Sequence, residues 1–570
     1  MLSPRLPSPD TLTLEEQVAQ MIVVRTTGHL FDHEVEYPQW EAKTAELKQL
    51  LAQGIGGIIL LGGSAAEVGV RTQQLQTWAK YPLLIAADIE EGVGQRFSGA
   101  TWFAPPMALG QIAQRDLPLA LKLAEQMGAA TAQEATAIGL NWILAPVVDV
   151  NNNPANPVIN VRSFGEQAEI VAQLTSAFVK GTQARTYGHA VLTSAKHFPG
   201  HGDTETDSHL SLPVVNHDFE RLQALELVPF ERAIAAGVDS IMTAHLQIPQ
   251  LDPDYPSTLS NITLSGLLRR DLGFDGLIVT DALVMGGITQ QYGAAEAAVL
   301  AVAAGADILL MPEDAQAAIA AICEAVNTGR LSAADILRAV ERIWRAKHKL
   351  ADLPVTDGMS RHAWQHQSVP PVQIEQIATE ETQALAAEIL RASQQVSHAP
   401  AQSLSQAISA PLIPGQNLVL VDDLLQCRFL GRNAPAVTLP TAQGYQLTLM
   451  DARSADIDRL QTDITTMVQL FIRGNPFRSS DRLSAIATQL IQALGNSVQA
   501  VVIYGSPYVW QQLQPLLPTK TPCVFTYGQM KRAQAIALQP LLNPNQLNPN
   551  QPIPKETRLS SGMLDGAFTD

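Results

Sequence analysis

The first 350 or so residues alternate, unit after unit, between short apolar runs and longer stretches with helical periodicity. The apolar runs lie at residues 21–24, 57–61, 83–87, 142–146, 190–194, 240–244, 277–280 and 308–311. Between them, apolar residues recur about every 3.6 positions, as in residues 119–138, 170–185 and 219–236. Strands that are apolar throughout and separated by helices are typical of a parallel sheet covered by helices. Eight such units predict an α/β fold, a (β/α)8 TIM-type barrel, rather than an open doubly wound sheet, because eight consecutive parallel units usually close.

Polar residues stand at the carboxyl ends of the predicted strands. They are Arg25, Asp88, Asp149, Lys196, His245 and Asp281. A barrel collects its catalytic residues at this end of its strands. We therefore expect an active site at the mouth that these strand ends form.

The length of 570 residues is too great for one domain. A last amphipathic helix over residues 332–350 ends in a basic cluster, after which the composition shifts to Pro, Ser, Gln and His. Shorter strands are predicted at residues 418–421, 446–450, 467–471, 500–504 and 521–525. We therefore expect a catalytic barrel over residues 1–350, a linker and bridging helix over 351–415, a smaller α/β sandwich domain over 416–541, and a low-complexity C-terminal tail with an Asn-Pro-Asn-Gln repeat over 542–570.

The charge and the cysteines limit the partners and the compartment. A net charge of −17 argues against nucleic acid or an anionic membrane as a partner. No apolar stretch reaches the roughly 18 residues of a spanning helix, and the start of the chain shows no signal-peptide pattern. The three cysteines show neither metal-ligand nor disulfide spacing, so we expect a cytoplasmic protein. No phosphate-binding or dinucleotide fingerprint is present, so we expect no nucleotide cofactor. The oligomeric state stays open.

One loop, residues 194–213, is unusually dense in titratable groups. They are Lys196, His197, His201, Asp203, Glu205, Asp207 and His209. In an extended segment Asp207 and His209 project to one side, where the carboxylate can orient the imidazole. Such a histidine can act as general acid and then base near neutral pH. The same loop has enough ligand types for a metal-dependent barrel hydrolase. Against a metal, the first strand end lacks the His-x-His that barrel metallohydrolases commonly place there, and we expect none.

The other candidate residues follow apolar strands. Asp281 ends the run 276–281, where it suits a nucleophile or general base and, equally well from position alone, the N-cap of the next helix. Glu90 and Glu91 read as solvated loop charges. The candidates for ligand binding are Asp88, Arg96, Arg162, Lys196 and His197. Several donors with little net charge suit a polar, mostly uncharged ligand, although Arg96 fits a structural ion pair as well.

In these motifs the sequence resembles family 3 glycoside hydrolases, and within them the β-N-acetylglucosaminidases. The match rests on Lys-His-Phe-Pro-Gly-His-Gly-Asp at 196–203 with Asp-Ser-His at 207–209, on 88–96, on Asn-Val-Arg-Ser-Phe-Gly at 160–165, and on Val-Thr-Asp at 279–281. The second domain, with Tyr-Gly-Ser-Pro at 504–507, resembles that of the two-domain members. The resemblance implies that Asp281 is the nucleophile, His209 the acid/base and Asp207 its dyad partner. It also implies that a terminal sugar is bound by Asp88, Arg96, Arg162, Lys196 and His197.

The expected activity is that of an exo-acting, retaining β-N-acetylglucosaminidase on peptidoglycan fragments or chito-oligosaccharides, working through a covalent glycosyl-enzyme. A β-glucosidase or β-xylosidase of the same family is an alternative, as is a sugar-binding module without catalysis. Phosphorolysis also stays open, because a histidine acid/base repels phosphate less than a carboxylate would.

Overall fold

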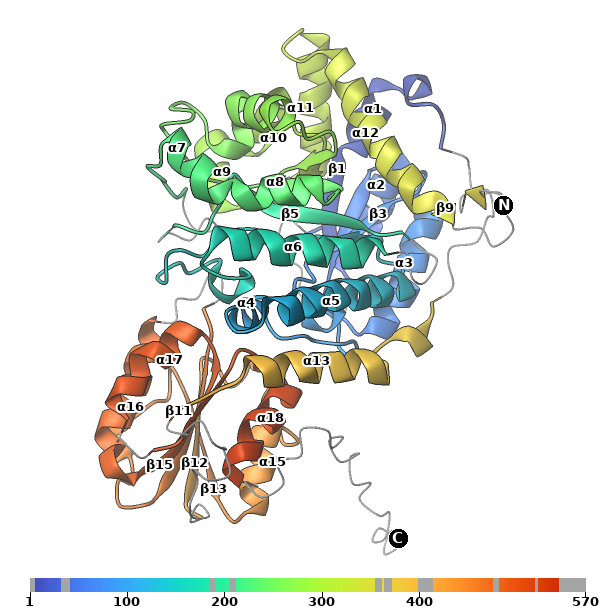
Figure 1. Ribbon diagram of the computed structural model, residues 1–570. Helices are drawn as coiled ribbons and strands as arrows, with labels where there is room; N and C mark the ends of the chain where they lie inside the picture. Colours follow the sequence, from blue (N-terminus) through green and yellow to red (C-terminus); the bar gives the residue numbers. More distant parts are fainter. Residues whose placement is uncertain are drawn as a thin grey trace, which may run out of the picture.

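The computed structural model describes residues 6–31, 41–184, 190–204, 212–353, 361–362, 372–397, 414–474, 481–517 and 521–542. Figure 1 shows two bodies, a larger one built from the first part of the chain and a smaller one built from the last part. An eight-stranded sheet lies in the first and a six-stranded sheet in the second. A two-stranded ribbon joins β9 (Asp352–Leu353) to β10 (Arg361–His362).

The eight strands of the first sheet are parallel and follow one another in chain order, with β8 beside β1. They are β1 (Ile22–Thr27), β2 (Gly57–Leu61), β3 (Leu84–Ala87), β4 (Trp142–Ile143), β5 (Leu192–Phe198), β6 (Ser240–Thr243), β7 (Leu277–Val279) and β8 (Leu309–Leu310). A parallel bridge between Val279 and Ile308 brings β7 against the last strand. The predicted barrel is thus confirmed as a nearly closed one, with each of its eight strands where an apolar run predicted it.

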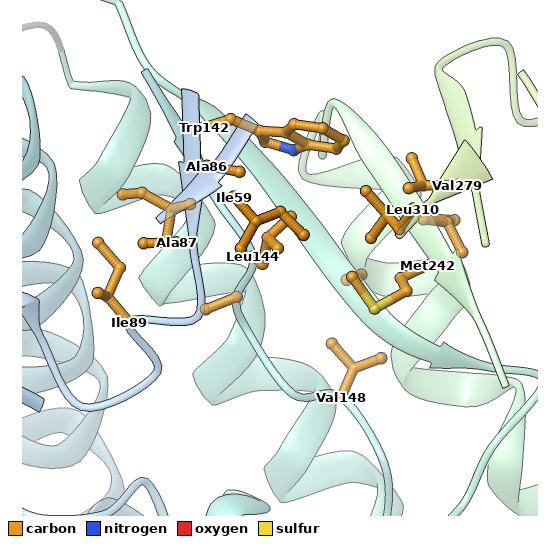
Figure 2. Packing of buried hydrophobic residues seen from close by; sticks show 14 of the residues in the cluster. Ile59, Ala86, Ala87, Ile89, Trp142, Leu144, Val148, Met242, Val279 and Leu310 are labelled. Carbon is orange, nitrogen blue, oxygen red and sulfur yellow. The ribbon is translucent and has the colours of Figure 1, made fainter. Parts of the chain in front are cut away.

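Side chains from opposite walls fill the barrel interior. Figure 2 shows Ile59 of β2, Trp142 of β4, Met242 of β6 and Leu310 of β8 gathered in one cluster, and these side chains are buried. The indole Nε1 of Trp142 is satisfied inside the barrel by the hydroxyl of Ser240, at 3.0 Å. The interior is therefore a packed core, and only the strand ends are left for chemistry.

Helices surround the barrel. They are α1 (Leu14–Gln20), α2 (Thr44–Gln53), α3 (Ala65–Trp78), α4 (Met107–Ala113), α5 (Leu117–Ala137), α6 (Ala168–Gln183), α7 (Phe219–Arg221), α8 (Val228–Ala235), α9 (Gly286–Tyr292), α10 (Ala294–Ala304), α11 (Ala315–Asn327) and α12 (Ala333–Ala351). Their ends follow local sequence signals. A capping box of Ser64 and Glu67 starts α3, and Gly305, with φ 113°, ends α10.

Two barrel segments differ from prediction. Strand β5 continues through Phe198, so Lys196 and His197 lie in the strand and not in the loop after it. The backbone N–H of Val148 donates to the carbonyl of Lys196 at 2.8 Å, which keeps this part of the strand paired. The single helix predicted over residues 219–236 is divided by a π-helical segment, Leu222–Glu226. Pro229 lies just after it, and a proline cannot donate the next helical hydrogen bond.

The second sheet has the order β11-β16-β15-β14-β12-β13, with only β11 antiparallel to its neighbour. Its strands are β11 (Gln395–Ser397), β12 (Gln416–Val421), β13 (Gln446–Asp451), β14 (Thr466–Ile472), β15 (Val498–Gly505) and β16 (Cys523–Thr526). The associated helices are α13 (Glu380–Ser393), α15 (Pro435–Ala442), α16 (Asp481–Leu494), α17 (Pro507–Leu513) and α18 (Lys531–Leu542). All five predicted strands of this smaller α/β domain are present, and the unpredicted β11 comes from the segment that precedes it.

Helix α13 packs against α4 and α5 of the barrel and against α18 of the second domain. Figure 1 shows it between the two bodies. No helix in the described part of the chain is long and apolar enough to cross a membrane. The Asn-Pro-Asn-Gln tail lies outside the described residues.

Candidate active site

Four charged side chains meet at the carboxyl ends of β3 and β5, and we call them the ion-pair cluster: Asp88, Glu90, Arg162 and Lys196. The Nζ of Lys196 lies 2.7 Å from Oδ1 of Asp88 and 2.7 Å from Oε1 of Glu90. The guanidinium of Arg162 donates twice to Glu90, at 2.9 and 2.8 Å. Two cations and two carboxylates thus form one connected group without net charge.

The environment keeps the ion-pair cluster charged. Burial alone would lower the pKa of Lys196, but Asp88 and Glu90 raise it above its ordinary value. Burial would raise the pKa of Glu90, yet Arg162 and Lys196 hold it well below its usual range. The side chains of Lys196 and Glu90 are only 2% and 3% exposed, whereas that of Asp88 is 37% exposed. Asp88 is therefore the carboxylate of this cluster that a ligand can reach.

Arg96 supports Asp88. Its Nε donates to the backbone carbonyl of Asp88 at 2.8 Å. Burial opposes ionisation of Asp88, but Lys196 and then Arg96 lower its pKa. Arg96 thus contacts the predicted site through Asp88. The carboxylate of Asp88 remains ionised and can accept hydrogen bonds from hydroxyl groups.

His197 is oriented by a buried carboxylate. Its Nδ1 lies 2.8 Å from Oδ2 of Asp149, and its Nε2 lies 3.4 Å from the guanidinium of Arg162. The backbone N–H groups of His197 and His201 also donate to Asp149. Burial would raise the pKa of Asp149, but the neighbouring His197 lowers it. An ionised Asp149 fixes the proton on Nδ1 of His197, which leaves Nε2 as the atom facing the cluster.

The loop that follows β5 is held close to the barrel by its glycines. Gly200 has φ 136°, a conformation that side chains disfavour. Gly202 is needed for a different reason, since a Cβ there would lie 1.7 Å from the carbonyl oxygen of Val150. Burial lowers the pKa of His201 to about 4, so this imidazole is neutral near pH 7. Asp203 lies 3.1 Å from Nε2 of His217. His201 and Asp203 therefore make local contacts that shape the loop.

Asp281 follows β7 and is half-buried. Its Oδ1 accepts from the backbone N–H of Ala282 at 2.7 Å, and its own N–H lies 3.4 Å from the hydroxyl of Thr243. The alternative role as a helix N-cap is wrong, because Met285 precedes the first residue of α9. Because β5, β6 and β7 are parallel neighbours in one sheet, Asp281 lies at the same end of the barrel as the loop after β5.

The structure brings most of the predicted residues together. Asp88 contacts Lys196, Glu90 connects Lys196 to Arg162, and Arg162 contacts His197. Arg96 joins this chain of contacts through Asp88. Asp207 and His209 lie outside the described residues. Within the ranges that the structure describes, no group of three or more His, Cys, Asp or Glu side chains is arranged to hold a metal ion.

The sequence reasoning missed the buried anions of this site. Glu90 is no solvated loop charge but the partner of two cations, and Glu91 is fully buried. The sequence places Asp149 at a strand end but does not predict its contact with His197. Charge balance is the signal that could have indicated a further buried anion. If Lys196 and Arg162 were buried beside Asp88 alone, one positive charge would be left uncompensated.

Comparisons with known proteins agree on one family. The model of the glycosyl hydrolase family 3 N-terminal domain matches residues 13–346, and that of the bacterial glycosyl hydrolase family 3 C-terminal domain matches residues 412–543. The chain is 37% identical over 338 residues to a protein named beta-hexosaminidase A from Pseudoalteromonas piscicida, covering 54% of this chain. It is 36% identical over 281 residues to a beta-hexosaminidase from Tolumonas auensis, covering 48% of this chain.

The chain spans about half of the Pseudoalteromonas relative's length, 55%, and 81% of the Tolumonas relative's. Among solved structures it is similar to a glycoside hydrolase family 3 beta-N-acetylglucosaminidase from Paenibacillus sp. str. FPU-7, with a TM-score of 0.72 and 30% identity. That similarity covers 93% of this chain and 97% of the other. Because the family models match the barrel and most of the second domain, the chain belongs to family 3 of the glycosyl hydrolases.

Proposed function

We propose that this protein is an exo-acting, retaining β-N-acetylglucosaminidase that removes terminal N-acetylglucosamine from peptidoglycan fragments or chito-oligosaccharides. Membership of the family supports glycoside hydrolysis, and the names of the Pseudoalteromonas, Tolumonas and Paenibacillus relatives support a hexosaminidase. The observation that carries the proposal is a half-buried carboxylate, Asp281, at the same barrel mouth as the charge-balanced ion-pair cluster.

Asp281 is the proposed nucleophile. Its carboxylate attacks the anomeric carbon of the terminal sugar as the glycosidic bond breaks, which gives a covalent glycosyl-enzyme with inverted configuration. Water then attacks the same carbon, displaces Asp281 and restores the β-configuration. The backbone N–H of Ala282 donates to Oδ1 of Asp281 and helps to orient the carboxylate.

His209, with Asp207 as its partner, is the proposed acid/base. It protonates the leaving oxygen in the first step and removes a proton from water in the second. This role rests on the sequence motif at 207–209, which matches the histidine-containing branch of the family. Retaining enzymes usually pair two carboxyl groups, so a histidine in this position is unusual.

The ion-pair cluster is the proposed clamp for the sugar. The exposed carboxylate of Asp88 can accept hydrogen bonds from sugar hydroxyls, while Lys196 and Arg162 offer the donor positions that their carboxylate partners leave open. Because the cluster carries no net charge, it suits a neutral ligand such as an acetamido sugar.

A panel of aryl β-glycosides, each assayed with and without phosphate, tests the proposal. We expect rapid turnover of the aryl β-N-acetylglucosaminide to free N-acetylglucosamine, at a rate that phosphate and a chelator leave unchanged. A preference for the aryl glucoside or xyloside would contradict the proposed substrate. A sugar 1-phosphate as product would contradict hydrolysis, and loss of turnover with the chelator would favour a metal-dependent enzyme.

A further inference from the structure

The second domain presents the carboxyl edge of its parallel strands to the barrel. The order β13-β12-β14-β15-β16 reverses direction between β12 and β14. In open α/β sheets this reversal point is where ligands usually bind. Here the side chain that follows β14 at this point, Arg473, forms an ion pair with Glu91 of the barrel. Its NH1 lies 3.1 Å from Oε2 of Glu91, and its NH2 bonds the other carboxylate oxygen.

Glu91 anchors the loop that carries two members of the ion-pair cluster. It follows Glu90 directly and lies three residues after Asp88. Besides Arg473, its carboxylate accepts from the indole Nε1 of Trp102 at 2.8 Å, and its backbone carbonyl accepts from Phe103 at 2.8 Å. The Glu91 side chain is 0% exposed and that of Arg473 is 13% exposed, so this is a buried contact between the domains.

The second domain also holds the loop that carries Arg162. The hydroxyl of Tyr508, on α17, accepts from Asn151 at 2.7 Å and donates to Glu166 at 2.7 Å. A Cβ on Gly474 would lie only 3.4 Å from Nδ2 of Asn160, two residues before Arg162. The two loops that supply Glu90 and Arg162 therefore both rest on one edge of the second domain.

We propose that the second domain holds the barrel loops of the sugar site in position and that Arg473 is a positioning residue for the ion-pair cluster. Arg473 holds Glu91, and Glu91 fixes the backbone from which Asp88 and Glu90 project. The inference rests on the proposed function only in that the cluster binds the substrate's sugar. Its prediction is a loss of substrate affinity when a residue outside the barrel is changed.

The test is Arg473→Met in the full-length enzyme, with Arg453→Met as the matched control. Arg453 is an exposed arginine of the same domain. We expect Arg473→Met to raise KM for the best aryl glycoside about tenfold or more, with a smaller change in kcat, because small displacements of binding groups weaken substrate contacts steeply. Arg473→Lys should recover part of the loss, and Arg453→Met should match the parent enzyme.

A second variant, Glu91→Gln, keeps the test decisive if Arg473→Met fails to fold. It breaks the same ion pair from the barrel side, and we expect it to raise KM by a similar factor. The double variant should then be no worse than the more affected single variant, because both changes remove one contact. KM values equal to that of Arg453→Met would overturn the inference. Because the readout uses whichever aryl glycoside the parent enzyme prefers, failure of the proposed substrate is seen separately, in the parent enzyme.

Discussion

At the scale of single residues, the sequence located the cations of the site better than the anions. Lys196 and Arg162 stood out in motifs, whereas Glu90 resembled any polar loop residue. Whether a carboxylate is solvated or buried depends on what packs over it, and that information lies in distant segments, here residues 72 and 106 positions further along the chain. Asp281 could be singled out from its position after an apolar strand, but excluding its role as a helix N-cap required knowing where α9 begins.

Glu90→Gln tests the charge balance of the ion-pair cluster. It leaves Lys196 and Arg162 buried beside Asp88 alone, and uncompensated buried charge costs about 3–5 kcal/mol. We expect the free energy of unfolding, measured with denaturant, to fall by roughly this amount, while Asp88→Asn costs less because Asp88 is 37% exposed. Glu169→Gln, on an exposed pair, serves as the control and should be neutral. Equal stability of the Glu90 variant and this control would show that the cluster is not needed for the fold.

His209→Ala tests the acid/base through the leaving group. Protonation matters most when the leaving group is a poor one, so turnover of a chito-oligosaccharide should fall far more than turnover of an activated aryl substrate. The values of kcat/KM on the two substrates, which report the first step, measure the difference, with Asp281→Asn as the control that loses both. Similar losses on both substrates would rule out His209 as the acid.

At the scale of helices and strands, apolar runs were sufficient to locate the barrel strands, because every barrel strand is built mainly from buried apolar residues. The errors in predicted strand limits arose where tertiary contacts determine whether a segment is a strand. Strand β5 extends past its apolar run since the ion-pair cluster accommodates Lys196 within the sheet, and β11 could not be predicted because its three residues form a strand only by pairing with β16.

Helix α12 contains a lysine, Lys347, that is buried by tertiary contacts and whose protonation can be tested. Its Nζ donates to Oε1 of Gln20 at 2.6 Å and lies 5.4 Å from the ring of Trp344. Burial lowers its pKa to about 7, well below the value near 10.4 of an unfolded chain. Between these values the unfolded chain binds a proton that the folded chain does not, so stability rises with pH, by at most about 1.4 kcal/mol per pH unit.

Lys347→Met should remove this dependence. We expect unfolding free energies measured across the window from about pH 7 to about pH 10 to rise less steeply in the variant than in the parent enzyme, with the largest gain for the variant at the low-pH end. Lys180→Met, at an exposed position of α6, should keep the parent slope. The same slope in all three proteins would mean that Lys347 stays protonated when folded.

At the scale of the whole molecule, the second domain contacts the barrel loops that carry the ion-pair cluster. The sequence predicted both domains from their separate patterns, but it held no signal for their contact, because Glu91 and Arg473 are 382 residues apart and Arg473 lies in no recognisable motif. The family comparisons cover both domains in turn and do not address this contact. The contact depends on how the domains pack, which brings the residue after β14 against the barrel loop that carries Glu91.

The proposed mechanism requires a covalent bond between Asp281 and the sugar. It is tested most directly in His209→Ala, where the second step lacks its base and an activated aryl β-N-acetylglucosaminide should leave the glycosyl-enzyme in place. After acid quenching and digestion, mass spectrometry should find one N-acetylglucosaminyl group on the peptide that contains Asp281, and none on that peptide when Asp281→Asn is added. A sugar on any other residue, or release of a product with inverted configuration and no adduct, would contradict the claim.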